Sequence, residues 1–449
     1  MRHLSSQLPL TTPWIDHPHA EELAAMSALL DAQPDLARHV QQDLEQRCPK
    51  NPRTGHPGLT GDQTLRLLIL RQLTGWSYAE LAFHVADSVT YRAFARVGAL
   101  VPAPSKSAIA DNMRRVHPET LATLNALVVT GPAARAIEPA RTVRMDATVV
   151  PVAIHHPTDS SLLWDAIRVL DRLLQQAETH AGFTAYHRHR RRAKRRALEI
   201  DHLAPHAVRR RRQCYQELLA LTDATASYAT CALAHLEALP TTPSRARLRR
   251  QLTALLPRIA QVVAQTTRRV LQGEVVPADE KLVSLFEAHA DVLVKERRET
   301  YYGHKIYLTT GRSGLILDCA IPKGNPGDVT WTVALVRRQQ RLFGRAPAQA
   351  AFDGAFASRA NLAALKGLGV GDVCFAKTRG LAIADMVRSE WVYTKLRRFR
   401  AGIESGISLL KRVFGLARCV WKGAVGFHAY VRTAVLAANL VVLARRRVT

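Results

Sequence analysis

The stretch TVRMDATVVPVAI, residues 142–154, decides the fold of this chain. It is rich in β-branched residues and almost continuously apolar, a pattern typical of a strand buried on both faces. Side chains alternate along a strand, so Arg144, Asp146 and Thr148 share one face. A carboxylate in such a strand is costly unless it is paired or bound to a metal. Asp146 is therefore either a hydrogen-bonded residue at a strand end or a functional residue.

The segments after this strand indicate a sheet that is interrupted by a long insertion. From residue 160 to about residue 300 the chain is mostly helical and strongly basic. Strand patterns then return at 304–310, 315–322, 348–353 and 372–377, with helices expected at 330–342, 360–368, 393–414 and 428–447. With 160–300 set aside, this is the element order of the RNase-H-like fold. We predict an α/β fold: an RNase-H-like mixed sheet flanked by helices, with an N-terminal all-helical domain and a long helical insertion after the first strand.

The N-terminal part is expected to be helical throughout. One helix is predicted at 20–46, and shorter helices follow between residues 65 and 128, one starting at the cap Ser77 and the next near Ser105 or Ser107. Short helices with polar turns fit either a DNA-binding unit of the helix-turn-helix type or a plain scaffold. The predicted domains are an N-terminal helical, DNA-binding domain at 1–135, a catalytic domain at 136–160 and 300–449, and a basic helical insertion at 161–299.

The charge of the chain predicts a polyanionic partner. Lys and Arg number 63 against 37 Asp and Glu, which gives a formal net charge of +26. Nucleic acid is the first expectation for such a balance and an anionic membrane a distant second. A cluster at 187–196 holds seven basic residues, among them Arg190, Arg191, Arg192, Lys194 and Arg195. It is either a phosphate-binding surface or the solvated face of a helical arm. Because aromatic residues make up only 6% of the chain, little stacking on unpaired bases is expected.

The sequence predicts a cytoplasmic protein. Its most apolar run, 433–444, is too short to span a membrane and is followed by three arginines, so we expect a buried core helix. The first residues contain no continuous apolar segment typical of a signal peptide. The six cysteines form no CxxC pair and are expected to be small buried residues in a reducing compartment.

Two further acidic residues stand in positions that suit chemistry. Asp353 ends a short apolar strand and is followed by Gly354, which fits either a ligand at the carboxyl edge of a sheet or an ordinary turn. In FRAGIESGISLLKRVFG, the spacing of Arg400, Glu404 and Lys411 puts all three on one helix face. Alone, this spacing fits a surface ion pair worth about 0.3–0.5 kcal/mol. Together, two Asp and one Glu could hold two divalent metals about 4 Å apart, and Mg²⁺ prefers such oxygen ligands.

The chain also resembles a known family over almost its whole length. The segments MDATVV, IHHPTDSSLLWDAIRVL, GHKIYLTT, GLILDCAIPKGNPGD, FDGAFAS and IESGISLLKRVFGLARCVWKG are similar to those of bacterial insertion-sequence DDE transposases, in particular the ISNCY-like group. The resemblance implies that Asp146, Asp353 and Glu404 form a catalytic triad. Arg400 and Lys411 match the basic members of a Tyr-Arg-Glu-Lys signature. The tyrosine of that signature would fall at Arg397, which leaves its role at the DNA end unfilled or passed to another residue.

The resemblance implies a mechanism and partners as well. The triad would hold two Mg²⁺ ions, with Mn²⁺ as a substitute. Water would cleave double-stranded DNA at the ends of the element, and the freed 3′-hydroxyl would attack target DNA. Two ends must be processed together, which implies a homodimer or a larger synaptic assembly. The protein would then act at the nucleoid in the bacterial cytoplasm, with no membrane partner.

Other interpretations remain open at this point. A structure-selective nuclease of the same fold would cut without joining strands, and a non-catalytic DNA-binding protein derived from a transposase would use the basic surface alone. Glu390 competes with Glu404 for the third carboxylate, although a helix start suits Glu390 better. His155, His156 and Asp159 could bind metal, but a helix capped at Thr158 or Asp159 is the preferred interpretation.

Overall fold

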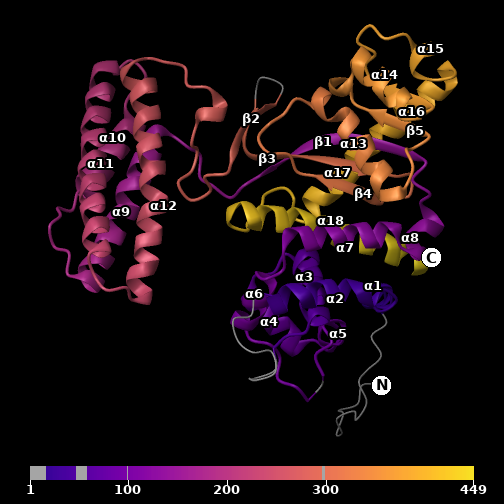
Figure 1. Ribbon diagram of the computed structural model, residues 1–449, viewed down its shortest axis with the longest axis horizontal. Helices are drawn as coiled ribbons and strands as arrows, with labels where there is room; N and C mark the ends of the chain where they lie inside the picture. Colours follow the sequence, from indigo (N-terminus) through magenta and orange to yellow (C-terminus); the bar gives the residue numbers. More distant parts are fainter. Residues whose placement is uncertain (1–16, 47–57, 99, 296–298, 449) are drawn as a thin grey trace, which may run out of the picture. The chain divides into compact units, whose positions relative to one another are not determined.

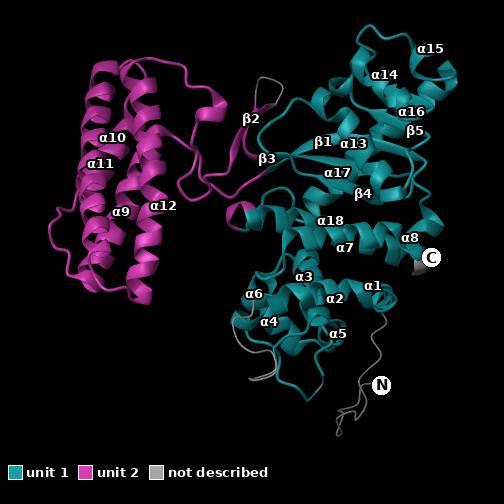
Figure 2. Ribbon diagram, in the orientation of Figure 1, with its two compact units in different colours: residues 1–150, 305–421, 425–449 teal, residues 151–304, 422–424 magenta. Residues whose placement is uncertain are grey.

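The computed structural model describes residues 17–46, 58–98, 100–295 and 299–448, which divide into two compact units. Unit 1 comprises residues 1–150, 305–421 and 425–449, and unit 2 comprises 151–304 and 422–424 (Figure 2). Cys48 lies outside the described residues. The described cysteines are free thiols, of which Cys214, Cys374 and Cys419 are buried. Cys231 is exposed, so the prediction that all are buried is wrong for this residue.

The described residues form a mixed six-stranded sheet in the order β2-β3-β1-β5-β6, with β4 also paired to β3. Strands β1, β5 and β6 are parallel neighbours, whereas β3 pairs with β2 and with β4 in the antiparallel sense. The strand bounds are β1 Thr142–Pro151, β2 Asp291–Lys295, β3 Glu299–Thr310, β4 Ile316–Ala320, β5 Gln349–Phe352 and β6 Asp372–Phe375. The mixed α/β prediction is confirmed. The sequence had not indicated β2, whose partner is the first half of β3.

Strand β1 is less buried than its sequence predicted. Val143, Met145 and Val150 are fully buried, but Arg144 and Asp146 are only partly so. The expectation of burial on both faces is therefore wrong, because the face that carries these polar side chains lies beneath helices without being sealed from water.

Helices flank the sheet of unit 1 (Figure 1). Helix α16 packs against β5 and β6, and α13 packs against β4. The helices after β4 are α13 Asp328–Phe343, α14 Arg359–Gly367, α15 Ile383–Met386, α16 Glu390–Ala401, α17 Ile403–Arg412 and α18 Gly423–Val448, with the short turn η3 Gly354–Phe356. The predicted helix at 393–414 is two helices, because the chain breaks at Gly402.

Helix α18 has the length and hydropathy of a membrane span, but 83% of its most apolar window is buried inside the protein. This burial agrees with the predicted core helix. A membrane is not needed to explain the apolar composition of the segment.

Two N-terminal helices of unit 1 begin at caps that the sequence predicts, Ser77 and Ser105, whereas the cap at Thr60 was not predicted. Thr60 and Ser77 form capping boxes, Ser105 caps α6, and Gly75 ends α3 in the left-handed conformation. Two of the predicted helices are each divided into two. The first is divided before Pro34, where α2 begins, and the second at Ser88, which caps α5. Proline fits the first turn of a helix but not its interior. The bounds are α1 Pro18–Asp31, α2 Pro34–Gln46, α3 Gly61–Thr74, α4 Tyr78–Asp87, α5 Val89–Phe94, α6 Lys106–Met113, α7 Pro118–Thr130 and α8 Pro132–Ile137.

A buried arginine holds three of these helices together. The side chain of Arg66 on α3 is fully buried and pairs with Asp62 at 2.8 Å and with Asp31 of α1 at 2.7 Å. It also donates to Ser27 and to the carbonyl of Phe94 on α5. Its charge is therefore neutralised and its donors are used, which is the condition for burying a cation.

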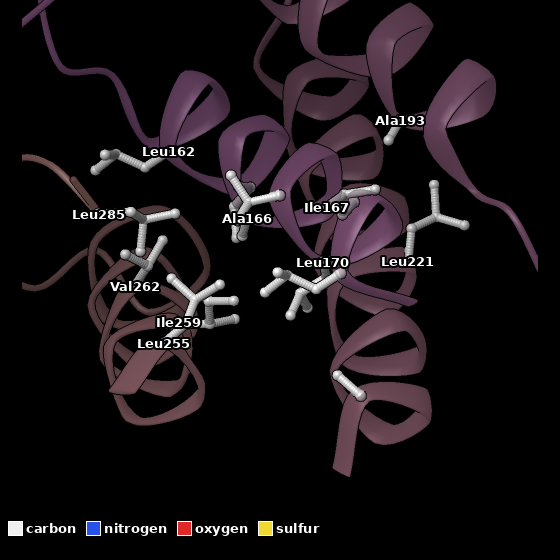
Figure 3. Close-up of a cluster of buried hydrophobic side chains, with 14 of the residues drawn as sticks. Leu162, Ala166, Ile167, Leu170, Ala193, Leu221, Leu255, Ile259, Val262 and Leu285 are labelled. Atoms are coloured by element: carbon white, nitrogen blue, oxygen red, sulfur yellow. The ribbon is translucent and has the colours of Figure 1, made fainter. Parts of the chain in front are cut away.

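Unit 2 contains four long helices, which share one apolar core (Figure 3). Helix α9 contributes Leu162, Ile167 and Leu170, and α12 contributes Leu255 and Ile259. The predicted cap at Thr158 is confirmed, since its hydroxyl accepts from Ser161 N–H. The bounds are α9 Asp159–Ala181, α10 Arg190–His202, α11 Val208–Glu237 and α12 Pro243–Thr266.

In unit 1, a buried asparagine joins α18 to the sheet. Asn439 Oδ1 accepts from the N–H of Ile316 in β4, and its Nδ2 donates to the carbonyl of Ile316 and to Asn125 of α7, all at 2.7–2.8 Å. The side chain thus bonds to the backbone N–H and carbonyl of Ile316 in β4, as a neighbouring strand would.

We expect Asn439→Leu to lower the free energy of unfolding by about 2–4 kcal/mol, because it leaves buried backbone groups of Ile316 without partners. Urea denaturation followed by circular dichroism would measure this. The matched control is Asn112→Leu, since the Asn112 amide bonds only to Ala108 within its own helix. Equal losses in the two variants would contradict the role given to Asn439.

Candidate active site

Parallel pairing brings Asp146 and Asp353 to neighbouring positions in unit 1. The register of β1 and β5 ends with Met145 opposite Phe352, and Asp146 and Asp353 are the residues that follow these two. Asp146 is largely buried, and its Oδ1 accepts from the backbone N–H of Ala147 at 2.8 Å. Asp353 follows the end of β5 and is 40% exposed. Asp353 therefore lies just past the carboxyl end of β5, where ligands collect in open α/β sheets, and Asp146 lies beside it in the middle of β1.

The residue after Asp353 must be small because a lysine packs against it. A Cβ on Gly354 would lie 2.6 Å from the Cβ of Lys377, which follows β6. The aliphatic stem of Lys377 thus passes beside the Asp353 turn. Sequence reasoning missed Lys377, although its position just after a parallel strand was a usable signal.

The third element of the site is the junction between α16 and α17. Arg400 lies in the last turn of α16 and Glu404 in the first turn of α17, on either side of Gly402. The expectation that Glu404 lies inside one continuous helix is therefore wrong. Lys411 lies in the last turn of α17. Glu390 is the first residue of α16, directly after the cap Ser389, which agrees with the helix-start role predicted for it.

Arg144 fixes this junction to the strand that carries Asp146. Its Nη1 donates to the carbonyl of Phe399 at 2.8 Å, its Nε donates to Thr310 at 2.9 Å, and its guanidinium lies 4.7 Å from the Phe399 ring centroid. A cation at the end of α16 also suits the negative end of the helix dipole. Sequence reasoning placed Arg144 on the face of Asp146 but gave it no role.

The guanidinium of Arg400 contacts all three carboxylates predicted for the site. Its Nη2 lies 2.7 Å from Asp146 Oδ2 and 3.5 Å from Asp353 Oδ1, and its Nη1 lies 3.0 Å from Glu404 Oε1. The structure therefore brings Asp146, Asp353 and Glu404 around one point. The side chain of Arg400 is only 16% exposed, whereas that of Glu404 is 66% exposed. The pair with Asp146 is thus shielded from water, and the pair with Glu404 is not.

The surroundings of Asp146 raise the pKa of its carboxyl. Burial is the largest cause, and the negative charge of Asp353 acts in the same direction. Arg400 and the Ala147 N–H lower the pKa, but they do not cancel the effect of burial. A carboxyl whose pKa is raised in the folded state stabilises the fold at low pH and loses that contribution as the pH rises through the folded-state pKa. When Asp146 is ionised, its buried charge therefore needs a cation nearby.

The donors of this cluster suit a hard divalent cation. Three carboxylates supply the oxygen ligands that Mg²⁺ and Mn²⁺ prefer. Within the described part of the chain, however, no three His, Cys, Asp or Glu side chains are close enough to share a metal ion as they stand. The reason is visible in the contacts, since the guanidinium of Arg400 lies between the carboxylates. The residue types fit a divalent ion, provided that Arg400 withdraws.

The basic cluster belongs to unit 2 and is not uniform. Arg190, Arg191, Lys194 and Arg195 on α10 are exposed, whereas Arg192 lies 3.5 Å from Glu217. Other arginines of the same run are committed to ion pairs within unit 2: Arg188 with Asp171, and Arg196 with Glu199 and Glu217.

The residues near 155–165 form a helix start in unit 2. Asp159 pairs with Arg269 at 2.8 Å and accepts from Thr266, while His155 lies 3.5 Å from Asp165. These contacts agree with the preferred interpretation, a helix start after the strand.

Two parts of the chain match protein families. Residues 13–115 match the family described as Transposase domain (DUF772), and residues 274–440 match the family described as Transposase DDE domain. The matches define the protein as a transposase. More narrowly, the chain belongs to the insertion-sequence DDE transposases. Asp353 and Glu404 lie within the second match, whereas Asp146 lies between the two. The search of curated proteins and the search of solved structures found no match.

The close approach of Arg144 predicts that a larger residue at position 402 destabilises the junction between α16 and α17. A Cβ on Gly402 would overlap Arg144 Nη1. We expect Gly402→Ala to lower the free energy of unfolding by about 1–3 kcal/mol, the usual cost of overpacking. The control is Gly406→Ala on α17, where a Cβ meets nothing within 4 Å and alanine should stabilise the helix by about 0.5–1 kcal/mol. Urea denaturation would compare them, and an equally stable Gly402→Ala would refute the contact.

Proposed function

We propose that this transposase cleaves double-stranded DNA at the ends of its insertion sequence and joins the freed ends to target DNA, with Asp146, Asp353 and Glu404 as its catalytic carboxylates. The observation that carries the proposal is the convergence of these three side chains, from β1, the end of β5 and α17, on one guanidinium. The family matches supply the reaction class.

The strand order supports an RNase-H-like catalytic domain. In unit 1, β4, β3 and β1 precede the parallel β5 and β6, and the order across the sheet is β4-β3-β1-β5-β6. We propose that this domain comprises 136–160 and 300–449, that 1–135 form a DNA-binding helical domain, and that 161–299 are an insertion between the first two strands of the catalytic sheet. The chain enters this insertion after β1 and returns to the catalytic sheet in β3.

Each proposed site residue has a distinct task. Asp146, Asp353 and Glu404 would hold Mg²⁺ or Mn²⁺, which when bound would activate the attacking oxygen and stabilise the leaving oxygen. In the hydrolytic step a water oxygen bonds to phosphorus and the bond to the 3′ oxygen breaks. In the joining step the oxygen of that 3′-hydroxyl bonds to a phosphorus of the target, and the bond from that phosphorus to the target's own 3′ oxygen breaks, which leaves a 3′-hydroxyl on the target strand. Arg144 holds the α16–α17 junction against β1, and Lys377 lies beside Asp353, where a DNA phosphate could contact it.

Basic residues supply the attraction to DNA. The net charge of +26 favours a polyanionic partner. Helix α10 presents four exposed basic side chains to solvent: Arg190, Arg191, Lys194 and Arg195. We propose that these residues, together with Arg192, Arg400 and Lys411, contact phosphates. We also propose that two or more copies of the chain assemble on paired DNA ends at the bacterial nucleoid.

Replacing the carboxylates tests the catalytic assignment. We expect Asp146→Asn, Asp353→Asn and Glu404→Gln each to lower the rate of end cleavage about 100-fold or more, because loss of a metal ligand removes several kcal/mol of transition-state stabilisation. The assay uses a plasmid carrying the gene with its flanking DNA, in Mg²⁺ or Mn²⁺, and scores cleavage and joining separately. DNA binding should survive.

Glu390→Gln is the matched control for Glu404→Gln and should remain active. Activity that survives in Glu404→Gln but not in Glu390→Gln would place the third carboxylate on α16. Cleavage without joining by the wild-type protein would favour the nuclease, and DNA binding without either step would favour the non-catalytic protein.

Salt dependence tests the DNA-binding surface. Each phosphate contact should contribute about −0.9 to the slope of log K against log salt. We therefore expect a steep slope for the wild-type protein, reduced by about 0.9 in Lys194→Gln. The control is Lys366→Gln, whose ammonium donates to the carbonyls of Gly371 and Met386 inside unit 1. Fluorescence anisotropy over a salt series would measure both, and a flat wild-type response would refute DNA as the partner.

A further inference from the structure

We propose that Arg400 is a positioning residue that assembles the three carboxylates before metal binds and must leave them when a divalent ion arrives. The inference rests on the proposed function, because it takes Asp146, Asp353 and Glu404 as the metal ligands. It adds a role that the spacing of Arg400 and Glu404 does not reveal, since that spacing indicates an exposed pair only.

The geometry of the Arg400 guanidinium, whose two terminal nitrogens form a fork, supports this role. One guanidinium nitrogen of Arg400 serves Asp146 and Asp353, and the other serves Glu404. A planar guanidinium can address several carboxylates from one place, which a lysine ammonium on its flexible stem does less well. Three elements that are distant in the chain, namely β1, the end of β5 and α17, thus meet at one side chain. Without a cation there, the carboxylates would repel one another.

Burial shows which of these contacts matters most. The side chains of Arg400 and Asp146 are 16% and 13% exposed, so their 2.7 Å pair lies in a medium that screens charge poorly. Removal of one partner from such a pair leaves an uncompensated charge, which is strongly destabilising. The contact with Glu404 is exposed and contributes little by itself.

The same contacts create a conflict with metal binding. Asp146 Oδ2 is already bonded to Arg400, and Asp353 Oδ1 contacts the same nitrogen. A divalent ion that uses these oxygens competes with the guanidinium for them. Arg400 is then free to pair with a phosphate of DNA, which it can bind in bidentate fashion. The divalent ion therefore takes the place of the guanidinium as the cation that neutralises Asp146 and Asp353.

A fixed structural ion pair would behave differently. It would contribute the same stability with and without metal, and its loss would not tighten metal binding. The two roles can be separated by measuring stability and metal affinity in the same variants, without any assay of cleavage.

The experiment uses the full chain and compares wild type, Arg400→Gln, Arg400→Lys and Arg398→Gln. Arg398 lies on the same helix, is exposed, and loses the same charge in its variant. Thermal unfolding is recorded in EDTA and in Mn²⁺, and Mn²⁺ affinity is measured by isothermal titration calorimetry.

We expect Arg400→Gln to lower the melting temperature in EDTA by about 2–4 °C, and Mn²⁺ to remove that deficit. Its Mn²⁺ dissociation constant should be about threefold lower than that of wild type, or lower still. Arg400→Lys, which keeps the charge but not the fork, should fall between the two in EDTA. Arg398→Gln should match wild type in both measurements.

Other results overturn the inference. An unchanged melting temperature in EDTA, a deficit that persists in Mn²⁺, or Mn²⁺ binding that is unchanged or weaker in Arg400→Gln would each refute it while leaving the proposed function intact. A wild-type protein that binds no Mn²⁺, or that binds it equally well as Asp353→Asn, would refute the proposed function and this inference with it.

Discussion

The structure of unit 1 depends on a carboxylate in the middle of a sheet. Asp146 is largely buried and has Asp353 as its neighbour, so it cannot be ionised there without a compensating cation. Arg400 supplies that cation from the last turn of α16. Helix α16 packs against β5 and β6 and ends just before Gly402, and this placement brings Arg400 to Asp146.

Arg144 and Gly402 explain how the end of α16 is held close to β1. Arg144 stands two residues before Asp146 on the same face of β1 and bonds to the last turn of α16 at Phe399. Because Gly402 has no Cβ, the guanidinium can lie against the junction. The strand that carries the first carboxylate therefore also holds the helices that carry Arg400 and Glu404. These contacts of Arg144, with Phe399 and with Thr310, all lie within unit 1.

Local patterns predicted much of the fold, and contacts between distant residues account for what they missed. Caps such as Ser77 and Thr158 are recognisable because a helix start depends on neighbouring residues. The candidate carboxylates were likewise recognisable from the strands and the helix that carry them. The pairing of Arg400 with Asp146 was not, because the two residues are 254 positions apart and helical spacing indicates only the exposed contact with Glu404. Strand β2 was missed because its five residues are defined mainly by their partner in β3.

The raised pKa of Asp146 marks a position at which a negative charge is costly to the fold. A residue selected for stability at this position would be neutral or apolar, since the ionised carboxyl loses stabilisation as the pH rises through its folded-state pKa. Local rules of stability are broken mainly at functional sites, where the cost is offset elsewhere. Here the offset is visible in the contacts: Arg400 neutralises Asp146, and Arg144 holds the helix from which Arg400 projects. The charge of Asp146 therefore depends on the cation that lies beside it, which here is Arg400.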